Sequence, residues 1–348
     1  MVVKKEVEIG GRVFSIETGK YAKQANGSVM VRYGDTMVLV TAVAASEAKE
    51  GLDYFPLQVE YREKTSAAGK FPGGYIKREG RPTEKEILSS RLCDRPIRPL
   101  FPESFTNETQ VVAMVMSYDG ENDPDVLAAC GASAALAISD IPFDGPMAEV
   151  RIGRVAGELI VNPTHEQIKL GDIELVVAGT ADSIMMVEGE SKEVSEQELL
   201  DALKFAQQEI KKIVDLQNQL RAEAGKTKWV VEEKSVDANI KKDVYDLAEA
   251  KYKEIVYSIL AKEERSAKNK ELSESIKKAL AEKYPEQEKV IGEILHDMEK
   301  DLMRERILKE GIRLDGRNTT QVRNITIELG NLPRTHGSAL FTRGETQS

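Results

Sequence analysis

The chain has 348 residues, of which 41% are hydrophobic and 31% are charged, and its net charge at pH 7 is −10. This length favours two to three domains with buried cores. No apolar run reaches the ~18 residues that a membrane-spanning helix needs, so the sequence predicts no membrane span. The acidic balance argues against nucleic-acid binding unless the basic residues cluster.

The cysteines, the histidines and the N-terminal sequence indicate a reduced, cytoplasmic protein. Cys93 and Cys130 are too few for a disulfide framework and do not form a Cys-x-x-Cys pair, so we expect both to be small buried hydrophobes. The N-terminus lacks the apolar core of a signal peptide. His165, His296 and His336 are isolated in the sequence, so we predict neither a zinc site nor a Ser-His-Asp arrangement.

The first sixty residues are rich in predicted strands. Apolar residues are concentrated in residues 7–9, 13–16, 28–32 and 36–42 and in part of 51–61. Glycine-containing turns separate the first two of these stretches, and also the next two, as expected for hairpins. A loop rich in glycine and lysine then covers residues 65–80.

Helix signals follow this loop. Thr83-x-x-Glu86 is a capping box, and we expect the helix that it opens to end at about Arg95, because Pro96 and Pro99 follow. Residues 110–118 resemble a buried strand.

Asp123 and Pro124 then supply an N-cap and a first helical residue. The helix that follows contains mostly small residues between positions 128 and 135, which would let a neighbouring sheet or helix approach closely. Further strands are expected at residues 148–155, 159–162, 173–178 and 183–187. Ser195-x-x-Glu198 caps a long amphipathic helix.

Residues 237–310 are rich in lysine and glutamate and give no strand signal. Their apolar spacing predicts about three packed helices, split near residues 271–273 and at Pro285, with Gly311 ending the last one. The sequence therefore predicts an α+β domain, a small all-helical domain and the start of a second α+β domain.

The most distinctive chemistry lies in residues 70–98, which combine a glycine-rich loop with the start of a helix. Their cations are Lys70, Lys77, Arg78, Arg81, Arg91, Arg95 and Arg98. Lysine and arginine could pair with RNA phosphates while Tyr75 stacks on a base. The alternative is that these cations pair with nearby acids, such as Glu79, Glu84, Glu86 and Asp94, and the residues alone favour neither.

The chain also contains an internal repeat. Residues 26–36 and 336–346 share Gly, Ser, Gly and Thr at one constant offset, which indicates a duplicated module. The second copy stops inside its first predicted hairpin, so we expect the chain to be the N-terminal part of a longer protein.

Two long motifs resemble bacterial polynucleotide phosphorylases: GRPTEKEILSSRLCDRPIRPLFP at residues 80–102 and THGSALFTRGETQ at residues 335–347. The resemblance implies a non-catalytic ribonuclease-PH-type domain at residues 1–225, an all-helical domain at 226–311 and the start of the catalytic ribonuclease-PH-type domain at 312–348. It further implies a cytoplasmic homotrimer that degrades single-stranded mRNA from the 3′ end to nucleoside diphosphates, with Mg²⁺ and inorganic phosphate. Proteins of an RNA-decay complex are implied as partners.

The family's catalytic copy carries a serine-rich phosphate turn and a Gly-Asp-x-Asp-Phe-Lys motif. At the matching positions this chain has Asp123-Pro124-Asp125, which should repel phosphate, and Asp172, Glu174 and Val176. Asp172 and Glu174 on one strand could in principle hold Mg²⁺, but without the lysine and the phosphate turn we favour a structural or edge-strand role for them. We therefore assign no catalytic residue and no metal ligand to this chain, and expect it to be inactive alone.

The family's pore loop usually reads Phe-Phe-Arg-Arg, and here it is Tyr75-Ile76-Lys77-Arg78. The resemblance implies that the first domain guides RNA. The candidate RNA-binding residues are Tyr75, Lys77, Arg78, Arg81, Arg91, Arg95 and Arg98. The alternatives are an RNA-binding and oligomerisation platform without enzymatic activity, or a helical module that docks a protein partner.

Overall fold

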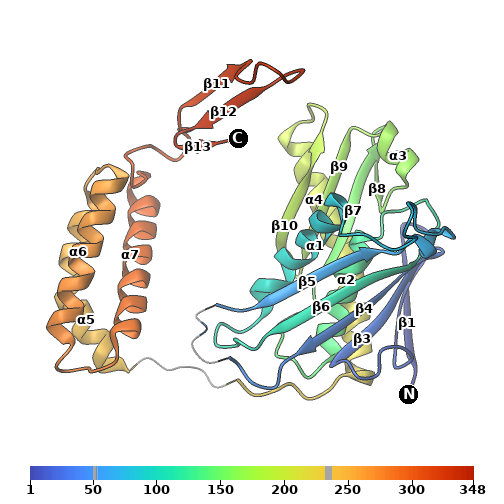
Figure 1. The fold of residues 1–348 in the computed structure, drawn as a ribbon, viewed down its shortest axis with the longest axis horizontal. Helices are drawn as coiled ribbons and strands as arrows, with labels where there is room; N and C mark the ends of the chain where they lie inside the picture. Colours follow the sequence, from blue (N-terminus) through green and yellow to red (C-terminus); the bar gives the residue numbers. More distant parts are fainter. Residues whose placement is uncertain (50–51, 53, 232–236) are drawn as a thin grey trace. The chain divides into compact units, whose positions relative to one another are not determined.

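The structure is a computed structural model that describes residues 1–49, 52, 54–231 and 237–348. The chain divides into two compact units, Met1–Glu233 and Lys234–Ser348. The first unit combines two sheets with helices, and the second contains α5, α6 and α7 together with a small sheet (Figure 1).

The first sheet has the strand order β1-β2-β3-β4-β6-β5. Neighbouring strands are antiparallel except β5 and β6, which run parallel. Both predicted hairpins are confirmed, because β1 pairs with β2 and β3 pairs with β4 across short glycine-containing turns. The strands are β1 (Val3–Ile9), β2 (Arg12–Thr18), β3 (Gly27–Tyr33), β4 (Thr36–Ala44), β5 (Leu57–Glu63) and β6 (Thr109–Ser117).

The second sheet is antiparallel, with the order β10-β9-β7-β8. Its strands, all predicted, are β7 (Ala148–Val155), β8 (Glu158–Val161), β9 (Ile173–Gly179) and β10 (Ile184–Ser191). The short helix α3 (His165–Leu170) was not predicted and begins at a capping box of Thr164 and Gln167.

Helix α2 (Asp125–Ile138) is the centre of the first unit, and every one of its residues is buried. It packs against β3, β4 and β6 of the first sheet and against β7 of the second. The predicted close approach is confirmed at Gly131, where a Cβ atom would lie 2.5 Å from a methyl carbon of Val40. Cys93 and Cys130 are both buried, as expected.

Two helix ends differ from the predictions. Helix α1 (Glu84–Ile97) includes Pro96 and continues into the 3₁₀ helix η2 (Arg98–Leu100), because a proline in the last turn removes only one helical hydrogen bond. The N-cap residue of α2 is Pro124 and not the predicted Asp123. The carboxylate of Asp123 instead forms an ion pair with Lys85, 3.0 Å from its Nζ. The capping box that opens α1 is confirmed.

Helix α4 (Glu196–Ala224) begins at the predicted capping box. The chain after it stays on the first unit, so this unit extends past the predicted boundary at residue 225. The amides of Lys226 and Trp229 donate to the carbonyls of Ile138 and Asp140, at 2.9 and 2.8 Å. Lys228 Nζ donates to two carbonyls at the end of α2.

In the second unit, α5 (Ala238–Tyr257), α6 (Lys262–Leu280) and α7 (Glu288–Glu310) pack side by side around an apolar core (Figure 1). The predicted break at residues 271–273 is wrong. Leu272 and Ile276 continue one buried face through α6, and the break lies at residues 258–261. The break at Pro285 and the end at Gly311, which has a φ of 67°, are confirmed.

The small sheet of the second unit consists of β11 (Ile325–Leu329), β12 (Ala339–Arg343) and β13 (Thr346–Gln347). The internal repeat forms the same turn twice, because Gly34 between β3 and β4 and Gly344 between β12 and β13 have φ values of 61° and 63°. Among the described residues, no helix is both long and apolar enough to cross a membrane.

Candidate functional site

The loop between β5 and α1 exposes its apolar side chains, which is unusual for a soluble surface. The Tyr75 side chain is fully exposed, and those of Phe71 and Ile76 are 90% and 80% exposed. Gly74 and Lys77 have φ values of 77° and 53°, so two residues of the loop adopt the left-handed backbone conformation. We call residues 70–98 the loop–helix surface.

Five cations of the loop–helix surface have no ion pair with any residue that the structure describes. They are Lys70, Lys77 and Arg78 of the loop, Arg81 before α1 and Arg91 on α1, and all five are exposed. Unpaired cations beside an exposed ring are what a sugar-phosphate backbone with stacked bases requires. The structure thus brings Tyr75, Lys77 and Arg78 together on one loop.

Arg95 and Arg98 do form ion pairs, as expected from the alternative in which the cations of this segment pair with acidic side chains. Arg98 forms a 2.7 Å contact with Asp94 and donates to backbone carbonyls before and in β5. Arg95 forms an ion pair with Glu188 of β10, far away in the sequence. These two arginines therefore connect α1 to the rest of the unit, and their place among the RNA-binding residues stays a prediction.

Phe71 and Ile76 were not among the predicted members of this surface. Phe71 lies between Lys70 and Pro72, and Ile76 lies between Tyr75 and Lys77. A sequence cannot show whether such a side chain is buried against the body of the unit or points to solvent. An apolar residue between glycines and lysines was the available signal.

A second group of charged residues includes Asp123, Asp125 and Glu174, which were compared above with the family's phosphate turn and catalytic motif. Arg151 of β7 lies at its centre, with Nη2 2.7 Å from Asp125 and Nη1 2.5 Å from Glu174. Asp123 lies 3.9 Å from the same guanidinium and 3.0 Å from Lys85. We call these residues the Arg151 cluster.

Each carboxylate of the Arg151 cluster is already paired with a cationic side chain, although the three carboxylates share only Arg151 and Lys85. Burial disfavours the ionised form of Asp123, but ion pairs with Lys85 and Arg151 nevertheless hold its pKa below the usual value. The Arg151 side chain is only 11% exposed, so a bound cation would have to displace a nearly buried guanidinium.

Asp172, the other candidate ligand, is held by a different arginine. Arg154 donates two hydrogen bonds to it, at 2.8 and 2.7 Å, and a third to Glu198 at 2.6 Å. The hydrogen bonds from Arg154 lower the pKa of Asp172. Asp172 and Glu174 thus have separate arginine partners, and the residues present do not fit a Mg²⁺ site.

The described residues contain no group of three or more His, Cys, Asp or Glu side chains placed to hold a metal ion. His165, isolated in the sequence, contacts the Tyr118 hydroxyl at 2.8 Å and lies 3.7 Å from Asp123. This contact involves no serine nucleophile, so it does not form a hydrolytic triad.

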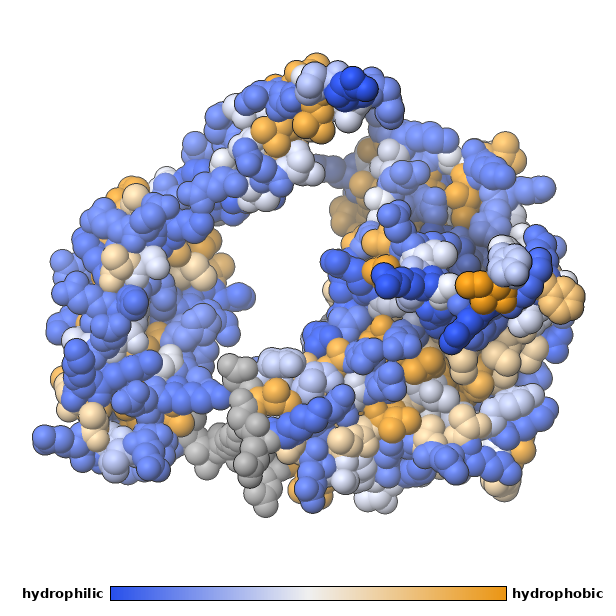
Figure 2. All heavy atoms as spheres, viewed as in Figure 1, coloured by the Kyte–Doolittle hydropathy of each residue, from blue (hydrophilic) through white to orange (hydrophobic). Residues whose placement is uncertain are grey.

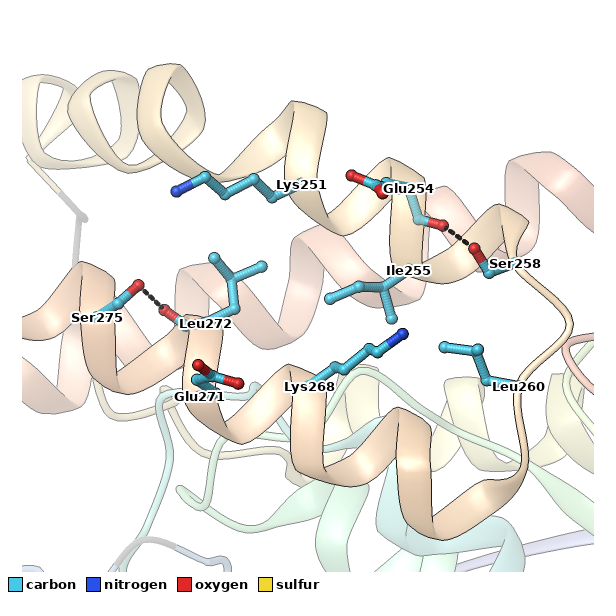
Figure 3. Close-up of a pocket in the computed structure, with 9 residues that line it drawn as sticks. All are labelled: Lys251, Glu254, Ile255, Ser258, Leu260, Lys268, Glu271, Leu272 and Ser275. Carbon is cyan, nitrogen blue, oxygen red and sulfur yellow. Dashed lines mark hydrogen bonds between the residues drawn. The ribbon is translucent and has the colours of Figure 1, made fainter.

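The second unit has a groove of about 340 Å³ between α5 and α6. Figure 3 shows Ile255, Leu260 and Leu272 directed into it, with charged side chains at its edges. The charged lining residues are two lysines and two glutamates, Lys251, Lys268, Glu254 and Glu271. Their charges balance, so the groove offers no excess positive charge to an RNA phosphate.

Hydrophilic residues cover most of the face of the helices that Figure 2 shows, with hydrophobic residues scattered among them. That surface gives little support to a module that docks an apolar partner. Of the three regions, the loop–helix surface is the one that combines several cations without an ion pair to any described residue with the exposed rings of Phe71 and Tyr75.

Three family models match the chain. "3' exoribonuclease family, domain 1" matches residues 10–142, and "3' exoribonuclease family, domain 2" matches residues 145–209. "Polyribonucleotide nucleotidyltransferase, RNA binding domain" matches residues 239–318, which include α5, α6 and α7.

Curated relatives match along the whole chain. A polyribonucleotide nucleotidyltransferase of Geobacter sulfurreducens is 53% identical over 99% of this chain and 49% of its own length. Those of Geotalea uraniireducens and Prosthecochloris aestuarii are 52% and 48% identical, over all of this chain and 50% of theirs. The chain spans about half the length of these relatives. The crystal structure of rice (Oryza sativa) Rrp46 aligns with a TM-score of 0.48 and 15% identity, over 60% of this chain and 94% of that one.

Proposed function

Because the chain belongs to the polyribonucleotide nucleotidyltransferase family, we propose that it supplies the RNA-guiding part of a phosphorolytic exoribonuclease. The whole enzyme removes nucleotides from the 3′ end of mRNA and transfers each to inorganic phosphate, which releases a nucleoside diphosphate. The role of this chain is to bind single-stranded RNA and lead it to the catalytic site.

The observation that carries this proposal is the exposed loop. Lys77 and Arg78 have no acidic partner among the described residues, and Tyr75 is fully exposed. Lysine and arginine bind phosphates without regard to sequence, and a base stacked on tyrosine adds affinity that any base can supply. A processive nuclease needs this kind of sequence-independent grip.

The phosphorolytic chemistry itself belongs, in this proposal, to a second ribonuclease-PH-type domain, whose start residues 312–348 resemble. Mg²⁺ and inorganic phosphate act there. The Arg151 cluster supports this division, because each of its carboxylates already forms an ion pair with Arg151 or Lys85, which a bound metal ion would have to break. This observation also favours the alternative that the chain by itself is a binding platform without activity.

Assembly follows from the same family membership. We propose a homotrimer in the cytoplasm, with further contacts to proteins of an RNA-decay complex. Ile87 and Leu88 on α1 are 51% and 59% exposed, which supports a role of this helix in subunit contacts. The proposed domains remain residues 1–225, 226–311 and 312–348, with residues 226–231 packed on the first.

One experiment separates binding from chemistry. A 5′-labelled oligo(A) is incubated with the 348-residue chain, Mg²⁺ and inorganic phosphate, and a gel shift is run on the same RNA. We expect a shifted band without release of ADP. Phosphate-dependent release of ADP would contradict the division of labour, and the absence of any shift would contradict RNA binding.

A second experiment tests the loop. Replacing both Lys77 and Arg78 with Ala should weaken binding and reduce the salt dependence of log K by about 1.4, because each phosphate contact on a single strand contributes about 0.7. The matched control replaces Lys204 and Lys211, two exposed lysines of α4. An unchanged slope in the loop variant would remove this loop from the RNA path.

A further inference from the structure

One bidentate contact closes the base of the exposed loop. The Glu79 carboxylate accepts hydrogen bonds from the Thr65 amide at 3.0 Å and from the Thr65 hydroxyl at 3.2 Å. Thr65 and Glu79 are 14 residues apart, so this contact joins the two ends of the segment that carries Tyr75, Lys77 and Arg78. We call it the Thr65–Glu79 clasp.

Both ends of the clasp are attached to the body of the first unit. Thr65 begins the 3₁₀ helix η1 (Thr65–Ala68), and the carbonyl of Ala67 accepts a 3.0 Å hydrogen bond from the Tyr118 amide that follows β6. On the other side, Arg62 of β5 donates to the carbonyl of Gly80 at 3.1 Å. The base of the loop therefore has a fixed position on the first sheet.

The arc above the clasp has no comparable support. Among the described residues, no side chain between Phe71 and Arg78 forms a hydrogen bond or an ion pair. Its glycines at 69, 73 and 74 leave the backbone many conformations. The clasp thus joins the two ends of the arc directly, and its two hydrogen bonds limit where the arc can lie.

We propose that Glu79 is a positioning residue for RNA: its carboxylate holds the loop in the arrangement that presents Tyr75, Lys77 and Arg78 to a single strand. This inference rests on the proposed function of the loop. A preformed loop loses less conformational entropy when it binds, so its apparent affinity is higher.

The sign of the effect makes the proposal testable. A carboxylate close to RNA repels phosphates, so charge alone predicts that removing Glu79 strengthens binding. The clasp predicts the opposite. Glu79→Ala should bind oligo(A) roughly three- to tenfold more weakly, as expected if the loop holds its binding arrangement only a tenth to a third of the time.

The slope of log K against log salt should not change in Glu79→Ala, because Lys77 and Arg78 still reach the same phosphates in the bound state. The matched control is Glu84→Ala, which removes one exposed carboxylate from the first turn of α1 without touching the clasp. It should bind as well as the unmodified chain, or better.

A neutral change at the other end of the clasp gives an independent test. Thr65→Val removes the hydroxyl donor without altering charge and should weaken binding, whereas Thr65→Ser keeps it and should restore binding. Trypsin should cut Glu79→Ala after Lys77 or Arg78 faster than it cuts the unmodified chain, with an unchanged midpoint of thermal unfolding.

The outcomes separate this inference from the function on which it depends. If Glu79→Ala binds as tightly as Glu84→Ala, while the Lys77 and Arg78 double variant loses affinity and slope, the clasp is refuted and RNA binding by the loop stands. If the double variant binds like the unmodified chain, the proposed function of the loop fails first.

Discussion

Glu149 of β7 offers a quantitative test of how the first unit is held together. Its side chain is 1% exposed, and neither carboxylate oxygen has a hydrogen-bond partner among the described residues. Burial, reinforced by the negative charge of Asp125, raises the pKa of Glu149 well above its usual value. We therefore expect the folded chain to keep this carboxyl protonated at pH values where the unfolded chain has released the proton.

The consequence for stability has a definite sign. Above pH ~4.3 the carboxyl at this position is ionised in the unfolded chain, so folding must take up a proton. The free energy of unfolding therefore falls by about 1.4 kcal/mol per pH unit until the pH reaches the pKa of the folded state. Between pH 5 and pH 7 this loss amounts to at most about 2.6 kcal/mol. For a domain of this size, that corresponds to roughly 5–10 °C in the unfolding midpoint.

Glu149→Gln has nearly the same shape and cannot ionise, so it should escape this loss. We expect the midpoint of Glu149→Gln minus that of the unmodified chain to increase from pH 5 to pH 7, measured by circular dichroism during heating. Glu158→Gln, an exposed position at the start of β8, controls for the loss of one carboxylate. The same difference at both pH values would refute the reasoning.

Two further predictions concern packing and charge. Arg151→Ala leaves the buried carboxylate of Asp125 without its ion-pair partner and should lower the free energy of unfolding by about 3–5 kcal/mol. Urea denaturation measures this change, and a loss below about 1 kcal/mol would show that the Arg151 cluster does not stabilise the fold. Gly131→Ala places a methyl group 2.5 Å from Val40 and should destabilise by about 1–3 kcal/mol, despite the better helix propensity of alanine. Gly292→Ala on α7, where the nearest atom is the mobile end of a lysine, should instead stabilise by up to about 1 kcal/mol, and equal effects in the two variants would contradict this account.

The starts of α1 and α4 and the turn at Gly34 were predictable because their signals lie in adjacent residues, although the start of α3 was missed and the cap of α2 lies one residue later than predicted. The capping boxes at Thr83 and Ser195 and the left-handed glycine at Gly34 act within one turn of the backbone. Helix ends were less predictable. Pro96 was expected to lie outside α1 and lies inside it, because a helix packed on its neighbours tolerates the loss of one hydrogen bond in its last turn.

The break between α5 and α6 shows the same limit. Local polarity at residues 271–273 suggested a loop, but Leu272 and Ile276 contribute to the core of the helical unit and keep α6 continuous. Tertiary burial of one helix face outweighs the weak preference of a few polar residues.

The candidate RNA-binding residues divide in a similar way. The sequence identified the loop and its cations, since their number and spacing are properties of the chain. It left open which of them are paired. That depended on the fold, because Arg95 finds its partner on β10 and Lys77 and Arg78 find none among the described residues.

By itself the sequence determined most of the strands and helices of the first unit, the duplicated module, the small-residue helix and the family, but not the short helix α3. Only the tertiary structure decided that Arg151 of β7 neutralises Asp125 and Glu174, 26 and 23 residues away along the chain. It alone also revealed the Thr65–Glu79 clasp. The physical reason is range: caps and turns are made by neighbouring residues, whereas ion pairs between strands, helices and loops exist only once the sheets have set their register.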